Sequence, residues 1–183
     1  MFEKERFIQE CRAALEVSNA QAAIQELVAR AVSEPAYIVR QLGEPKLAGV
    51  DMLYRADDLT ILNLRWGPRM VFKPHDHRIW AVIGIYGGCE QNIFFRRSEH
   101  GLTQHGTKEL NAKETVPLGA AFIHAVTNPL DQITAAIHVY RGDFFATPRS
   151  EWDSKTFVEK PYDVADTLRA FEESNLRLRD AGL

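Results

Sequence analysis

The strongest constraint on the fold is a series of short β-prone runs that begins near Gly49 and continues to Arg141. Turn-forming residues separate these runs, as at Gly67-Pro68 and Asn128-Pro129. Many short strands at nearly regular spacing are typical of a β-sandwich or barrel. The predicted strands cover residues 50–55, 59–66, 79–86, 89–97, 107–116, 120–126 and 133–141. We therefore expect a mostly β fold, with a two-residue hairpin at Gly87-Gly88.

Helical patterns lie on both sides of this β-prone region. Apolar residues recur at helical spacing within residues 7–15 and 24–31, and again from Val164 to Leu178. The chain has 183 residues, which is enough to bury a sizeable core, and it shows no repeat or linker. The sequence therefore predicts a single domain over residues 1–183. Its predicted parts are a helical lead-in over 1–45, a β-barrel core over 49–150 and a C-terminal helix over 162–181.

Charge and cysteine content argue against several kinds of partner and compartment. The formal net charge is −3, so we expect no nucleic-acid partner. No apolar run approaches the roughly 18 residues of a membrane span, and we expect no membrane partner. The two cysteines form no CxxC pair, and the N-terminus has no apolar signal-peptide core, which favours a cytoplasmic protein. The sequence leaves open whether the chain is a monomer or a small homo-oligomer.

Two histidines one residue apart, His75 and His77, are candidates for a metal site. On a strand they would point to the same face, about 7 Å apart along the chain. A third ligand is then expected from another strand, and His124 follows a short apolar run. His100 and His105 lie in a polar, glycine-containing segment and are interpreted as loop residues without a role. A histidine pair of this kind also arises by chance, and a histidine on an apolar strand is often a core residue.

Three histidines without a carboxylate leave open positions on a metal, where oxygen or a substrate can bind. Neutral imidazole suits iron, nickel, copper and zinc alike, so the ligand type alone does not identify the metal.

Several short motifs occur together in a specific order. They are WGP at 66–68, PHDH at 74–77, WAVIG at 80–84, IHAVTN at 123–128 and IHVY at 137–140. With these motifs the chain resembles the cysteine dioxygenase and 3-mercaptopropionate dioxygenase family, the thiol dioxygenase branch of the cupins, over roughly residues 50–150. The resemblance implies a cupin fold, a double-stranded β-helix or jelly-roll barrel, here with N-terminal helices and a C-terminal helix.

The resemblance also implies an activity. His75, His77 and His124 would bind Fe(2+), and a small thiol carboxylate would coordinate it through sulfur. Dioxygen would then convert the thiol to a sulfinic acid. Many metal cupins place a glutamate a few residues after the histidine pair, but Ala81 and Val82 stand there in this chain.

Four further residues receive roles from the resemblance. His138 and Tyr140 match two members of the outer Ser-His-Tyr set of the family, and on a strand they would share one face. Arg149 lies at the offset where mercaptopropionate-type members hold the substrate carboxylate, and a guanidinium group has the right shape for that task. Arg55 is a second candidate for the same role. Either arginine can instead be an ordinary surface residue.

Three features depart from the family pattern. Ala136 stands where the family has its serine, and alanine cannot hydrogen-bond His138. Val82 stands where animal cysteine dioxygenases carry the cysteine that crosslinks to tyrosine, so no crosslink is expected, and Cys89 is interpreted as a strand residue. Arg69 and Arg78 add charge near the histidine pair, either on the surface or to bind an anionic substrate.

These departures leave two alternatives beside the thiol dioxygenase. One is a three-histidine cupin enzyme that acts on a non-thiol substrate, for example by cleaving a diketone. The other is a cupin that binds a metal and a small molecule without turnover.

Overall fold

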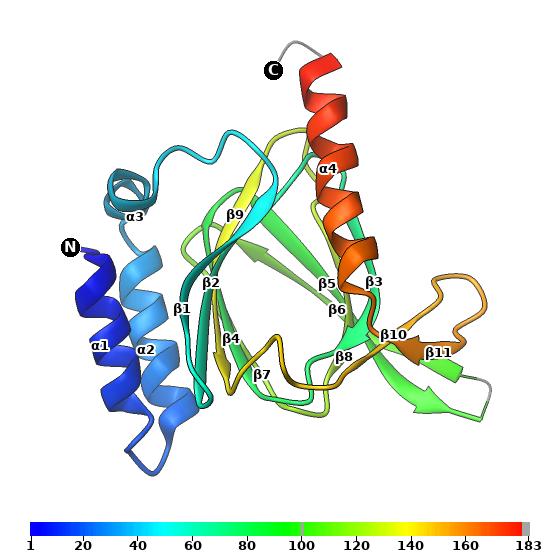
Figure 1. Ribbon diagram of the computed structural model, residues 1–183, viewed down its shortest axis with the longest axis horizontal. Helices are drawn as coiled ribbons and strands as arrows, with labels where there is room; N and C mark the ends of the chain where they lie inside the picture. The colour runs from blue at the N-terminus through cyan, green and yellow to red at the C-terminus, as the bar shows by residue number, and fades with distance from the viewer. Residues whose placement is uncertain (100, 181–183) are drawn as a thin grey trace.

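The computed structural model describes residues 1–99 and 101–180. Three helices, α1 (Lys4–Ala14), α2 (Ala20–Val32) and α3 (Pro35–Leu42), precede the strands, and α4 (Val164–Asp180) follows them (Figure 1). The strands are β1 (Gly49–Arg55), β2 (Leu59–Trp66), β3 (Val71–Asp76), β4 (Ala81–Gly87), β5 (Cys89–Ser98), β6 (Gly101–Asn111), β7 (Thr115–Leu118), β8 (Ile123–Thr127), β9 (Thr134–Arg141), β10 (Ser150–Trp152) and β11 (Glu159–Pro161).

The strands form two antiparallel sheets that enclose a barrel interior. One sheet has the order β1-β2-β9-β4-β7, and the other has the order β11-β10-β3-β8-β5-β6. Without the added edge strands β1, β10 and β11, the orders become β2-β9-β4-β7 and β3-β8-β5-β6. From β2 to β9, successive strands alternate between the two four-stranded sheets, except that β5 and β6 form a hairpin in one of them. This is the arrangement of a jelly roll. The predicted cupin-type double-stranded β-helix with flanking helices is therefore confirmed.

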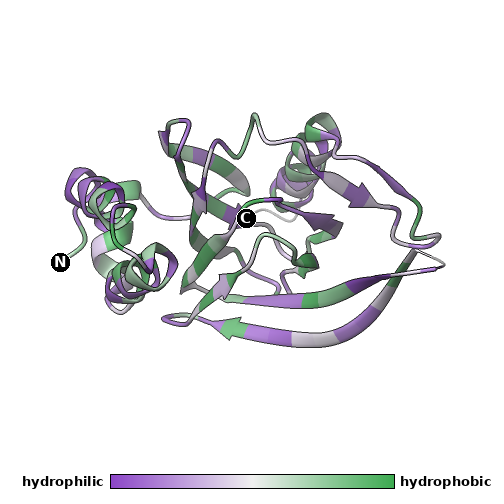
Figure 2. Cartoon of the chain, turned by 90° about the horizontal axis from the view of Figure 1, so that it is seen from below, coloured by the Kyte–Doolittle hydropathy of each residue, from purple (hydrophilic) through white to green (hydrophobic). Residues whose placement is uncertain are grey.

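Strands β2, β9 and β4, at the centre of the five-stranded sheet, are buried on both faces, and this explains their nearly continuous apolar sequences. Along β9, Ile137 and Val139 pack in a cluster with the N-terminal helices, where Ile24 and Val28 of α2 are fully buried. The alternate residues Ala136 and Tyr140 belong to the cluster inside the barrel. Figure 2 shows α1–α3 as a separate layer beside the sheets. The helices thus cover the outer face, and the inner face is left for the site.

The predicted hairpin at Gly87-Gly88 is wrong. β4 pairs with β7 and β9, whereas β5 pairs with β6 and β8 in the other sheet. The glycine pair carries the chain from one sheet to the other. Gly88 has a φ of 76°, and a Cβ atom there would lie 2.4 Å from the Thr134 hydroxyl oxygen. The signal for a turn was correct, but a local turn signal does not determine which strands pair.

The loop expected around His105 is also wrong. His105 lies on β6, which pairs with β5 from Gly101 to Asn111, with a shift of register at His105 itself. β6 is an edge strand with most side chains exposed, so its polar composition is compatible with a strand. His100, which was interpreted in the same way, lies outside the described residues. The strands also continue beyond residue 150 as β10 and β11, and α4 is described to Asp180, so residue 181 of the predicted helix is not described.

Helix α4 lies along the side of the barrel away from α1 (Figure 1). The ring of Phe171 stacks on Trp66, with ring centroids 5.8 Å apart, and also contacts Phe72. Asn175 makes two hydrogen bonds with the backbone of Ala48, one through each side-chain atom. Lys73 of β3 forms an ion pair with Asp166. These contacts hold α4 against the barrel wall that borders the candidate site.

Within the described part of the chain, no helix has both the length and the apolar character needed to cross a membrane.

Candidate metal centre

The structure brings His75, His77 and His124 together inside the barrel. His75 on β3 lies opposite His124 on β8 in the strand register, and His77 follows directly after β3. The Nε2 atoms of His75 and His77 are 3.2 Å apart, and those of His77 and His124 are 3.3 Å apart. The three side chains are almost inaccessible to solvent, with relative exposures of 7%, 5% and 1%. Pairing between β3 and β8 therefore produces the cluster that the sequence predicted.

Two of these rings are oriented by their other nitrogen atom. His75 Nδ1 lies 2.9 Å from the carbonyl oxygen of Lys73, and His124 Nδ1 lies 2.6 Å from Asn92 Oδ1. Both partners are acceptors in this geometry, so both Nδ1 atoms donate a hydrogen. The Nε2 atoms of His75 and His124 then carry lone pairs that face His77. Histidine ligands of metals are commonly held in this way.

Burial keeps the three imidazoles neutral. It lowers the pKa of His75 to about 4, although the hydrogen bond with Lys73 acts in the opposite direction. Burial and the neighbouring histidines hold the pKa values of His77 and His124 well below the usual range. At neutral pH the three side chains therefore present lone pairs rather than positive charges, as metal binding requires.

The spacing of the ring nitrogens suits a metal ion. A bond of about 2.0–2.1 Å from zinc to imidazole nitrogen places neighbouring ligand nitrogens roughly 3.0–3.4 Å apart. The two Nε2 separations, 3.2 and 3.3 Å, fall within this range. The observed donor set therefore fits a metal bound by three imidazoles, and among the described residues no carboxylate or thiolate joins it.

A pocket opens from the three histidines toward α4. Its walls are mostly apolar and include Leu62, Leu64, Phe72 and Phe171. Arg149 is the one arginine that lines it, and among the described lining residues there is no carboxylate. The pocket thus combines a possible metal site, a single guanidinium group and apolar walls. Such a combination suits a small anionic or partly apolar ligand.

His138 and Tyr140 lie on the wall of the same pocket. His138 Nδ1 is 2.9 Å from the Tyr140 hydroxyl oxygen. The ring of Tyr140 stands perpendicular to that of His77, with centroids 5.1 Å apart. Burial raises the pKa of Tyr140 far above neutral pH, so its phenol keeps its proton. Tyr140 is thus a neutral hydrogen-bond donor beside the three-histidine cluster.

Arg149 is held between two aromatic rings. Its guanidinium carbon lies 3.8 Å from the centroid of Phe144 and 4.2 Å from that of Tyr162. It also donates a hydrogen bond to the carbonyl oxygen of Phe144. Its Nε atom is buried and has no hydrogen-bond partner among the described residues. The guanidinium group is thus fixed by stacking and keeps an N–H group that no described residue accepts.

Arg55, the second candidate for the substrate carboxylate, is not brought to the pocket. Its guanidinium group makes a bidentate interaction with Asp143, with distances of 2.8–3.0 Å. Its position at the end of β1 places it on the outer edge of the five-stranded sheet.

The other residues noted in the sequence have structural contacts. Arg69 pairs with Asp131, and Arg78 pairs with Asp76. Val82 packs on the helix-facing side of its sheet, away from Tyr140, and Cys89 is buried near Glu109.

Sequence analysis missed two polar residues behind the site, Glu90 and Asn92 on β5. The Glu90 carboxylate is completely buried and accepts hydrogen bonds from Trp66 Nε1 and Asn92 Nδ2, each at 2.8 Å. Its Oε2 atom lies 3.8 Å from His138 Nε2. Their spacing could have identified them, because two polar residues at i and i+2 on a strand share one face.

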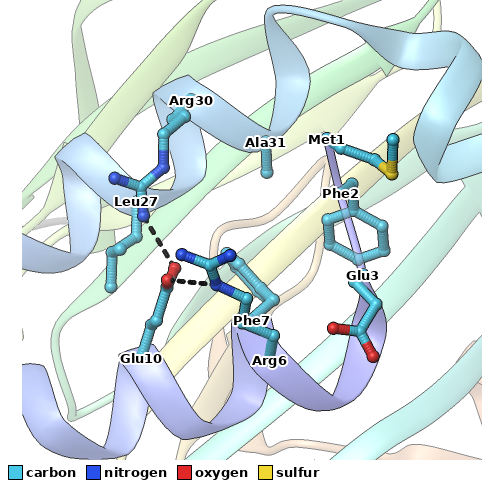
Figure 3. Close-up of a pocket in the computed structure, with 9 residues that line it drawn as sticks. All are labelled: Met1, Phe2, Glu3, Arg6, Phe7, Glu10, Leu27, Arg30 and Ala31. Carbon is cyan, nitrogen blue, oxygen red and sulfur yellow. Dashed lines mark hydrogen bonds and ion pairs between the residues drawn. The ribbon is translucent and has the colours of Figure 1, made fainter.

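A second pocket lies between the first residues of the chain, α1 and α2 (Figure 3). Three of its charged side chains are paired with one another, because Glu10 accepts hydrogen bonds from Arg6 and Arg30 at 2.9 and 2.7 Å. None of its described lining residues is a histidine or cysteine, so it adds nothing to the metal centre.

No family model matches the chain. Among solved structures, the DMSP lyase DddQ from Ruegeria pomeroyi DSS-3 shows 17% identity and a TM-score of 0.47, over 60% of this chain and 53% of that one. An oxalate oxidase in complex with glycolate shows 14% identity and a TM-score of 0.43, over 54% and 53%. A Klebsiella pneumoniae subsp. pneumoniae MGH 78578 protein with a double-stranded β-helix domain shows 11% identity and a TM-score of 0.41, over 53% and 74%. The match spans about half the length of the first two proteins.

Proposed function

We propose that this protein is an iron-dependent thiol dioxygenase that oxidises a small thiol carboxylate to its sulfinic acid. The observation that carries this proposal is the buried cluster of His75, His77 and His124, which opens onto a pocket with Arg149 as its one arginine. Three neutral ligands leave the full charge of a divalent ion uncompensated. This favours a substrate that binds as a thiolate anion.

When bound, Fe(2+) supplies the redox chemistry that lets dioxygen react with the thiol. Both oxygen atoms are transferred to sulfur, and sulfur loses the electrons that dioxygen gains, so no further reductant is needed. His75, His77 and His124 would hold the ion through their Nε2 atoms. The hydrogen bonds from His75 to Lys73 and from His124 to Asn92 keep these two rings in place.

Arg149 binds the substrate carboxylate in this proposal. Stacking between Phe144 and Tyr162 restricts the guanidinium group before the substrate arrives, which reduces the entropy lost on binding. The buried Nε–H is the donor that a carboxylate oxygen would satisfy. A thiol carboxylate then has two anchor points, its sulfur at the histidine cluster and its carboxylate at Arg149.

Tyr140 presents its hydroxyl oxygen at the reacting centre as a hydrogen-bond acceptor. Its phenol stays protonated because burial raises its pKa, and its ring lies beside His77. The hydroxyl hydrogen of Tyr140 is donated to His138 Nδ1 at 2.9 Å, which restricts the direction of the hydroxyl group. The apolar walls formed by Leu62, Phe72 and Phe171 limit the access of water to this region.

The same apolar walls favour one second candidate, a three-histidine dioxygenase that acts on an apolar diketone. Such a substrate would coordinate the metal through oxygen and would not require Arg149.

Oxygen uptake by the anaerobically iron-loaded protein separates these candidates. The protein is offered 3-mercaptopropionate, cysteine, cysteamine and pentane-2,4-dione in parallel, with His124→Ala as the control. We expect uptake with a thiol carboxylate, a stoichiometric sulfinate product by mass spectrometry, and loss of both in the control. Bound iron without uptake on any thiol would contradict the proposal, and uptake with the dione alone would favour the second candidate.

A further inference from the structure

The buried carboxylate of Glu90 uses both of its oxygen atoms. Oε1 accepts a hydrogen bond from Asn92 Nδ2, and Oε2 accepts one from Trp66 Nε1, each at 2.8 Å. Burial by itself would raise the pKa of Glu90, but interactions with His138, Asn92 and Trp66 outweigh it and lower the pKa. A charged carboxylate with no exposed surface is uncommon unless charged or hydrogen-bonding neighbours compensate for its burial.

One of those neighbours is His138, which lies across the barrel on the other sheet. Its Nδ1 atom contacts the Tyr140 hydroxyl group, and its Nε2 atom has no hydrogen-bond partner among the described residues. The charged group that faces Nε2 is Glu90 Oε2, at 3.8 Å. Ala136, on the same face of β9, offers only a methyl group. The Glu90 carboxylate is therefore placed to orient the His138 ring through Nε2.

The second neighbour is the candidate ligand His124. Because the Asn92 amide nitrogen donates a hydrogen bond to Glu90, its Oδ1 atom is the one that faces His124 Nδ1 at 2.6 Å. The orientation of the Asn92 amide thus depends on Glu90, and the tautomer of His124 depends on that amide.

We propose that Glu90 is a positioning residue that sets the tautomers of His138 and His124. His138 carries its proton on Nε2, toward Glu90, and accepts the Tyr140 hydroxyl hydrogen at Nδ1. His124 carries its proton on Nδ1, toward Asn92, and leaves Nε2 free for a metal. The role of Tyr140 in thiol oxidation rests on the proposed function, but the two tautomers do not.

The substitution Glu90→Gln tests this arrangement with little change of shape. A carboxylate accepts hydrogen bonds on both oxygens, whereas an amide accepts on one and donates on the other. If the amide nitrogen faces Asn92, the Asn92 amide must turn and His124 loses its Nδ1–H tautomer. If it faces Trp66 and His138, the proton of His138 moves to Nδ1. One of the two histidines must therefore change.

The first measurement is long-range 1H–15N NMR of the zinc-loaded, full-length protein with 15N-labelled histidine. The wild-type protein needs no substitution for this test, and the spectrum of His138→Gln identifies the His138 signals. We expect a protonated Nε2 and a bare Nδ1 in His138, and the opposite in His124. His138 protonated on Nδ1, or on both nitrogens, would overturn the proposal.

The second measurement is metal affinity by competition with a chelating dye. Loss of a residue that orients a metal ligand through hydrogen bonds typically lowers the metal affinity by about 10–100-fold. We expect Glu90→Gln to show either this loss or a changed His138 tautomer, while the exposed Glu109→Gln on β6 shows neither. A Glu90→Gln protein that folds, keeps both tautomers and binds zinc normally would overturn the inference. Neither readout requires oxidation of a thiol, so failure of the proposed function is distinguishable from failure here.

Discussion

The carboxylate of Asp76 accepts a hydrogen bond from the backbone N–H of Ser150 at 2.8 Å. The residue between the two predicted ligands thus faces away from them and holds the segment that carries Arg149. Asp76 also accepts from Arg78 Nε at 2.5 Å, and its side chain is buried. Asp76 therefore connects the segment that carries the histidine pair to the segment that carries Arg149.

Removal of this contact is expected to weaken substrate binding more than metal binding. Asp76→Ala should raise KM for the thiol carboxylate about tenfold, and loss of buried charged hydrogen bonds should destabilise the protein by about 1.5–3 kcal/mol. Steady-state kinetics and urea unfolding measure the two effects. Asp131→Ala removes an exposed partner of Arg69 and should change neither. An unchanged KM in a folded Asp76→Ala protein would refute this role.

Substitution of Arg149 distinguishes substrates by their carboxylate. Arg149→Gln removes the charge that pairs with the carboxylate, so KM for 3-mercaptopropionate should rise about 10–100-fold, the equivalent of a charged hydrogen bond. Cysteamine has no carboxylate, and its kinetics should change little. Arg55→Gln is the matched control, because Arg55 pairs with Asp143 outside the pocket. An equal change of KM for both thiols would mean that Arg149 does not bind the substrate carboxylate.

The stability of the metal-free protein should fall in mild acid. The folded-state pKa of His75 is about 4, below the usual value of 6.5, and those of His77 and His124 are also lowered. The unfolded chain therefore binds more protons between pH 6.5 and 4, so stability is present above 6.5 and is lost as pH falls through this window. Urea unfolding at pH 7.5, 6 and 5 measures the loss. The loss of unfolding free energy should be smaller in His124→Asn, and in the exposed His105→Gln it should equal that of the wild-type protein. A free energy of unfolding that does not change with pH would contradict the prediction.

Phe171 is expected to be the main contact that holds α4 on the pocket wall. It is buried against Trp66 and Phe72, and truncation of such a ring costs about 3–5 kcal/mol. Phe171→Ala should therefore lower the free energy of unfolding by that amount, measured by urea denaturation. Leu176→Ala, on an exposed position of the same helix, should cost much less. Similar losses in both variants would show that α4 is held elsewhere.

Much of the metal centre was predictable because it depends on local alternation. The spacing of His75 and His77 and the apolar run before His124 indicated that these side chains point inward. The pair His138 and Tyr140 followed from the same rule, given the family resemblance. The position of Arg55 could not be predicted in this way, because a residue at a strand end can turn toward any nearby acid. Here Arg55 pairs with Asp143 and is not among the described residues that line the pocket.

The sequence by itself determined most of the segments that form strands and helices and which side chains share a face, because these properties repeat within a few residues. The short strands β3, β10 and β11 were not among the predicted strands. Only the tertiary structure decided that β4 and β5, joined by Gly87-Gly88, lie in different sheets. It also decided that Glu90 of one sheet faces His138 of the other across the barrel. Such contacts depend on how two whole sheets bury their apolar faces against each other, and no local pattern specifies that arrangement.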